Sequence, residues 1–129
     1  MVKNYEASIV ETTKELTAKE KIKLKDLSNA INLDALTQEQ EAPVRINVDF
    51  YVKLNIHNEK SKDRPDYENI VVVDKDGTKF YTGSGSFMTA LAEIYEEMAD
   101  AGETEIVIDV YRKPSKNYNG KEFITCSIV

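Results

Sequence analysis

Basic and aromatic side chains gather in two polar stretches of this sequence, residues 60–67 and 111–123. Cations that neutralise phosphates, next to flat rings on which unpaired bases stack, are the chemistry that single-stranded nucleic acid requires. We predict that the cations contact phosphates and that the tyrosines stack on bases. The predicted site consists of Lys60, Lys62, Arg64, Tyr67, Tyr111, Arg112, Lys113, Lys116, Tyr118 and Lys121. The alternative for the second stretch is an ordinary hairpin with solvated lysines.

The net charge of −6 argues at first against a nucleic-acid partner. The acidity is concentrated, however, because residues 93–109 hold seven Asp and Glu and no Lys or Arg. The rest of the chain from Val44 onward carries 11 Lys and Arg against 8 Asp and Glu. Surfaces outside the acidic segment can therefore be locally basic.

No pattern of residues indicates an enzyme. The single Cys126 excludes an intramolecular disulfide, and the single His57 excludes a histidine-rich metal site. The acids of residues 93–100 lie at the spacing of one helix face, which predicts a solvated surface. Gly83 and Gly85 lack the third glycine and the Lys-Ser/Thr pair of known phosphate loops, so they predict a loop that leads into a helix cap. We expect no catalytic residues, no metal and no cofactor.

The element that must position the basic stretches is a long strand over residues 44–57. Apolar side chains occupy every even position from Val44 to Ile56, and the odd positions are mostly polar. Successive side chains of a strand point to opposite faces, so this alternation predicts a strand with one continuous apolar ridge. At roughly 3.3 Å per residue it would be about 45 Å long, which favours a strand that bends and serves two halves of a barrel.

The elements after the long strand follow a recognisable order. Residues 70–73 and 78–82 predict a hairpin, apolar residues at helical spacing predict a helix over 87–98, and residues 105–112 and 121–129 predict a second hairpin. Strand, strand, strand, helix, strand, strand is the order of the OB-fold, a five-stranded and partly open barrel. We therefore predict a mainly β, OB-fold-like barrel with one helix over residues 44–129. A plain α+β sheet packed by the helix is the alternative.

Residues 1–43 predict an N-terminal α/β extension that belongs to the same domain. Residues 5–11 read as a short strand. Thr17 and Glu20 have the form of a helix capping box, but the alternation of apolar residues that follows also fits a strand over 21–25 and a short helix over 27–36. We expect the strand and then the helix, because the Ser and Asn residues of this stretch are mediocre helix formers.

The order of elements over residues 44–129 resembles that of small single-stranded-DNA-binding proteins of bacteriophages and mobile elements in Gram-positive bacteria. Two stretches add to the resemblance, Tyr81-Thr82-Gly83-Ser84 and Pro114-Ser115-Lys116-Asn117-Tyr118-Asn119-Gly120-Lys121. The resemblance implies non-catalytic binding of single-stranded DNA with little sequence preference, in DNA replication or recombination. It also implies a homo-oligomer and a phage or host replication protein as partner.

The expected location is the cytoplasm, that of the host if the protein is phage-encoded. No apolar run approaches the ~18 residues that a membrane-spanning helix needs, and the N-terminus lacks the apolar core of a signal peptide. The alternative function is a protein-binding module, for instance a phage-encoded inhibitor that uses its acidic helix as a nucleic-acid mimic.

Overall fold

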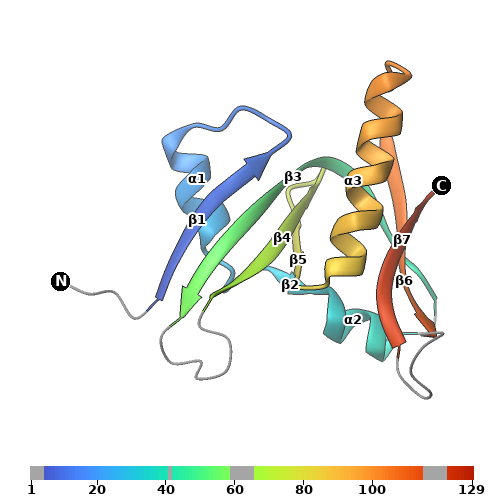
Figure 1. Cartoon of the computed structure of the whole chain (residues 1–129), viewed down its shortest axis with the longest axis horizontal. Coiled ribbons are helices and arrows are strands. Elements are labelled where there is room, and N and C mark those ends of the chain that lie inside the picture. The colour runs from blue at the N-terminus through green and yellow to red at the C-terminus, as the bar shows by residue number, and fades with distance from the viewer. Residues whose placement is uncertain (1–4, 41, 59–65, 115–121) are drawn as a thin grey trace.

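The computed structural model describes residues 5–40, 42–58, 66–114 and 122–129. It is mainly β and contains one curled seven-stranded sheet with three helices (Figure 1). The strands are β1 (Tyr5–Thr12), β2 (Ile31–Asn32), β3 (Val44–Asn58), β4 (Asp66–Asp74), β5 (Lys79–Thr82), β6 (Ile106–Pro114) and β7 (Glu122–Ile128). The helices are α1 (Ala18–Lys25), α2 (Leu33–Glu39) and α3 (Gly85–Asp100). None of these helices is long and apolar enough to cross a membrane.

The long strand β3 is the spine of the sheet, as its alternation predicts. Its edge towards β4 is paired over most of its length. Its other edge is shared, since β6 pairs with the first half of β3 and β1 pairs with the second half. The sheet order β2-β5-β4-β3-β6-β7, with β1 beside β3, follows from this sharing.

The apolar ridge of β3 is not continuous, which corrects the prediction. The register between β3 and β4 shifts between Val48 and Phe50, so Asp49 forms a β-bulge. Before the bulge, the even residues pack into a cluster beneath α3. After it, the even residues pack into a second cluster on the opposite face, and Tyr51 takes the α3 side. The bulge thus lets one alternating sequence fill two cores.

Each core is closed by a different part of the chain. Phe87 and Leu91 of α3 and Leu33 at the start of α2 are fully buried in the first cluster. Leu24 of α1 is buried in the second cluster against β3 and β4. The middle strand β4 contributes alternate residues to both clusters, because each of its faces is covered.

The prediction for the N-terminal segment is partly wrong. The strand β1 is confirmed and pairs with β3. The expected strand over residues 21–25 is the helix α1, capped by the reciprocal bonds of Thr17 and Glu20. The expected helix over 27–36 is displaced to α2, which begins at Leu33 because the Asn32 side chain accepts a hydrogen bond from the Asp34 N–H (2.9 Å).

The order of elements from β3 onward is as predicted, including the Asp76–Gly77 turn, in which Gly77 has a φ of 93°. The sheet is curled, which is broadly compatible with an OB-like barrel. Among the described residues, however, β5 pairs with β2 rather than with β7, so no ladder closes the barrel there. Instead, the Ser84 and Ser86 hydroxyls donate to the Ile124 carbonyl (3.4 and 2.8 Å) across the gap between β5 and β7.

Candidate nucleic-acid interface

The ten predicted site residues divide into two groups. Six of them lie outside the described residues, namely Lys60, Lys62, Arg64, Lys116, Tyr118 and Lys121. The other four lie on β4 and β6: Tyr67, Tyr111, Arg112 and Lys113. The described ends of β3 and β4 next to residues 59–65, and those of β6 and β7 next to residues 115–121, lie on the lower side of the molecule in Figure 1, with α2 between them.

Tyr67 is not brought together with Tyr111. Tyr67 pairs with Ile56 near the end of β3 and is half-buried against the second cluster. Tyr111 follows Val110, which pairs with Val44 at the start of β3. The two rings therefore lie towards opposite ends of a 15-residue strand.

Arg112 lies on the α2 side of β6 and is engaged there. Its guanidinium donates to the Asp34 carbonyl (2.8 Å) and to the Thr37 hydroxyl (3.2 Å) of α2. A phosphate contact would have to compete with these two bonds. The position of Arg112 thus indicates a role in holding α2 on the sheet.

Tyr111 and Lys113 lie on the opposite side of β6, on a surface that we call the outer face. None of its residues is buried, and it extends across three strands. The outer face comprises Arg45, Asn47, Val107, Asp109, Tyr111, Lys113, Phe123, Thr125 and Ser127. It is the side of the hairpin that turns away from α3.

Two aromatic residues, Tyr111 and Phe123, lie on the outer face. Tyr111 is paired with Thr125, and Lys113 is paired with Phe123, so Tyr111 and Phe123 occupy diagonal positions. Diagonal side chains on one face of an antiparallel pair are about 7–8 Å apart. The Tyr111 hydroxyl lies 2.6 Å from the Ser127 hydroxyl, so the Tyr111 side chain leans towards Ser127 and away from Phe123. The sequence prediction left Phe123 out of the site, although the alternation in residues 122–128 places it on the face of Tyr111.

The charge of the outer face is mixed. The Arg45 guanidinium binds both carboxylate oxygens of Asp109 (2.9 and 3.2 Å). These bonds lower the pKa of Asp109 below its usual value and raise the pKa of Arg45. Lys113 is exposed beside the rings. The face therefore offers stacking surfaces and one nearby cation, and a larger positive charge would have to come from the loops.

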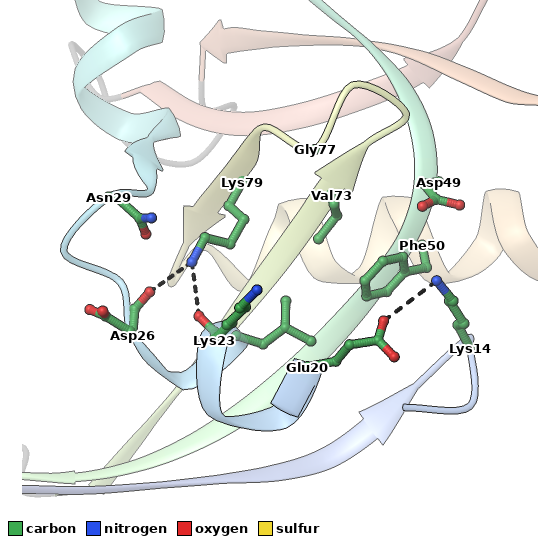
Figure 2. Close-up of a pocket in the computed structure, with 11 residues that line it drawn as sticks. Lys14, Glu20, Lys23, Asp26, Asn29, Asp49, Phe50, Val73, Gly77 and Lys79 are labelled. Atoms are coloured by element: carbon green, nitrogen blue, oxygen red, sulfur yellow. Dashed lines mark hydrogen bonds and ion pairs between the residues drawn. The ribbon is translucent and has the colours of Figure 1, made fainter. Parts of the chain in front are cut away.

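The face of β4 and β5 that carries the ligand in OB-folds is covered here. Val71 and Val73 pack with Leu24 of α1. Lys79 of β5 fastens that helix, because its ammonium donates to the carbonyls of Lys23 (2.8 Å) and Asp26 (3.0 Å) at the end of α1 (Figure 2). A nucleic acid cannot lie on this part of the sheet while α1 is in place.

A cavity of about 530 Å³ remains beside α1 and is drawn in Figure 2. Its charges are balanced, because Lys14, Lys23 and Lys79 are accompanied by Glu20, Asp26 and Asp49. The Lys14 ammonium lies 3.6 Å from the Glu20 carboxylate and 4.8 Å from the centre of the Phe50 ring. Such a balanced cavity has no preference for an anion.

The described residues show no metal-binding cluster of three or more His, Cys, Asp or Glu. Burial raises the pKa of the Cys126 thiol to about 12, so this cysteine is a thiol at neutral pH. His57 contacts the Asp66 carboxylate through Nδ1 (2.7 Å) at the end of β3. These two residues occupy the places expected from the sequence, a buried position and a loop edge.

No protein-family model, curated protein or solved structure matches this chain.

Proposed function

We propose that this protein binds single-stranded DNA non-catalytically and with little sequence preference, through the outer face and the two basic loops next to its hairpins. The observation that carries the proposal is that two aromatic residues, Tyr111 and Phe123, lie at diagonal positions of one open face that also carries Lys113. Ring-on-base stacking contributes about 1–3 kcal/mol per base and tolerates any sequence. The order of elements shared with OB-folds supports the same proposal. Its biological setting would be replication or recombination of phage or mobile-element DNA in the cytoplasm.

The first test is a titration with oligo-dT at low and moderate salt, followed by tyrosine fluorescence, with a duplex of equal length as control. The chain has seven Tyr and no Trp, so tyrosines supply the signal. We expect quenching that saturates with single strands and weakens with salt. Absence of a response at low salt, or an equal response to the duplex, would contradict the proposal.

Variants then locate the site. Tyr111→Ala should weaken binding of oligo-dT by about 5- to 150-fold, which corresponds to the loss of one stacking ring at about 1–3 kcal/mol. Tyr111→Phe keeps the ring and loses only the bond to Ser127, so it should bind nearly as the parent protein does. Lys113→Ala should flatten the dependence of affinity on salt, whereas Lys75→Ala, an exposed lysine of the β4–β5 turn, should not. Equal affinities of Tyr111→Ala and the parent would remove the outer face from the site.

A protein-binding module is the second candidate function. The observation that favours it is an apolar groove between the acidic helix α3 and β7. Reversal of the charges of Glu93, Glu96 and Glu97 would abolish function if this candidate is correct, and the loop lysines would then be dispensable.

A further inference from the structure

A groove of about 400 Å³ runs between α3 and β7 on the side of the hairpin opposite the outer face. Its floor is apolar and is formed by Ala90, Ile94 and Met98 of α3 and by Cys126 and Ile128 of β7. Ile128 is 47% exposed and the adjacent Val129 is 60% exposed. Exposed branched apolar residues in a concave surface indicate a site for an apolar side chain.

One wall of the groove is the edge of the sheet, and this edge is unpaired in the described part of the chain. The Val129 N–H donates to the Val107 carbonyl (2.9 Å), so Val129 faces β6. Backbone groups alternate in direction along an antiparallel strand, so the N–H and C=O of Ile128, Cys126 and Ile124 face away from β6. The carbonyl of Ile124 confirms this direction, because it accepts the bonds from Ser84 and Ser86.

The protection of this edge is therefore uneven. The two serine hydroxyls satisfy the edge at Ile124, where α3 begins. Further along, at Ile128, no described strand or side chain pairs with the edge-facing N–H and C=O. An unpaired strand edge is a template for an added extended segment.

The rim of the groove on the helix side is acidic. Glu93 and Glu97 both line it, and residues four apart lie next to each other on a helix surface. Neither carboxylate takes part in an ion pair with another described residue. A second copy that docked symmetrically through the same groove would bring the same two carboxylates to the interface, so charge disfavours such a dimer. A basic partner is favoured by the same charges.

We propose that the groove between α3 and β7 binds an extended, basic segment of a partner protein. The segment pairs with the edge of β7 at Ile128, places an apolar side chain on Ile94 and Met98, and directs its Lys or Arg side chains to Glu93 and Glu97. This interaction surface is separate from the proposed DNA-binding face, since the two lie on opposite sides of the β6–β7 hairpin.

The test uses the whole chain and a fluorescently labelled synthetic peptide in an anisotropy titration. In an extended conformation the peptide presents Lys, Ile and Lys on one face and Thr residues on the other, and the control peptide has Glu in place of each Lys. We expect saturable binding of the basic peptide and none of the acidic one. Binding of neither peptide, or of both equally, would overturn the proposal.

Matched variants separate the parts of the groove. Glu93→Gln with Glu97→Gln should weaken peptide binding about fivefold or more, whereas Glu96→Gln with Asp100→Asn, an equal change of charge on the same helix outside the groove, should not. Ile128→Pro removes the edge-facing N–H without removing a bond to β6 and should weaken binding about fivefold or more. Ile128→Val keeps that N–H and should bind normally. Equal peptide binding by the two double variants of α3 would overturn the contact with Glu93 and Glu97. Equal binding by Ile128→Pro and Ile128→Val would overturn the pairing with the edge of β7.

Two further measurements distinguish a basic partner segment in the groove from a second copy of this chain, and peptide binding from DNA binding. Sedimentation of the free protein tests for a second copy, and a dimer abolished by Ile128→Pro would show that the chain itself fills the groove and overturn the proposal. Tyr111→Ala should bind the peptide as the parent does, so failure of the DNA proposal and failure of this one give different results.

Discussion

At the scale of single residues, Lys79 shows how a lysine can act as a structural tie. Its ammonium donates to two carbonyls at the end of α1, those of Lys23, which also accepts the Asp26 N–H (3.3 Å), and of Asp26. The positive charge also lies at the negative end of the helix dipole. Lys79 thereby connects the N-terminal segment to β5, more than 50 residues away in the sequence.

We expect Lys79→Met to lower the free energy of unfolding by about 1 kcal/mol, and to speed hydrogen exchange in α1 more than in α3. The reason is that the Asp26 carbonyl loses its donor among the described residues and the Lys23 carbonyl keeps only the Asp26 N–H, while the aliphatic part of the side chain is kept. Lys75→Met, in the adjacent turn, is the control and should leave exchange unchanged. Equal exchange rates in α1 for the two variants would show that the hydrogen bonds of Lys79 are not needed to stabilise α1.

The buried thiol of Cys126 leads us to predict that the stability of the fold decreases at high pH. Its pKa of about 12 exceeds the ordinary value of 9.0, because burial disfavours the thiolate. The unfolded chain releases this proton first, so the contribution of Cys126 to stability is present below pH 9 and is lost as the pH rises from about 9 to 12. Thiol labelling at pH 8.5 should be slow in the folded protein and fast in urea. Rapid labelling of the folded protein would contradict the buried position.

At the scale of elements, the Asp49 bulge decides which core each half of β3 fills. A one-residue change of register moves every side chain of a strand to the other face. Deletion of Asp49 should therefore turn Val44, Ile46 and Val48 away from α3 and prevent folding, as judged by loss of the far-ultraviolet circular dichroism of the native sheet. Asp49→Ala keeps the extra residue and should fold. A folded deletion variant would show that the bulge is dispensable.

The sequence predicts most of these elements and little of their arrangement. The alternation in residues 44–57 marks β3 because every even residue there is buried, but no residue type indicates the bulge at Asp49. The strand predicted over 21–25 is wrong because Ile22 is 71% exposed, so the alternation there reflects no buried face, and the capping box was the better guide. In the candidate site, the sequence does not show that Arg112 bonds to Asp34 and Thr37, because these partners lie more than 70 residues away.

At the scale of the whole molecule, the two cores are parts of one cooperative structure. Strands β3 and β4 contribute to both clusters, so neither cluster can open without exposing residues of the shared strands. We expect Leu24→Ala in the second cluster and Leu91→Ala in the first each to cost about 2–5 kcal/mol and to leave a single unfolding transition. Circular dichroism and tyrosine fluorescence should coincide during urea unfolding of both variants. A separate early transition in Leu24→Ala would show that α1 unfolds on its own.

The bonds of Ser84 and Ser86 to the Ile124 carbonyl bear on how the sheet is closed. A barrel whose strands are hydrogen-bonded all round resists widening, because several backbone bonds must break together. Here the gap between β5 and β7 is spanned by two hydroxyls on a single carbonyl. Closure across that gap therefore depends on α3, through these hydroxyls and through Phe87 and Leu91 in the first cluster, and not on a ladder of backbone bonds.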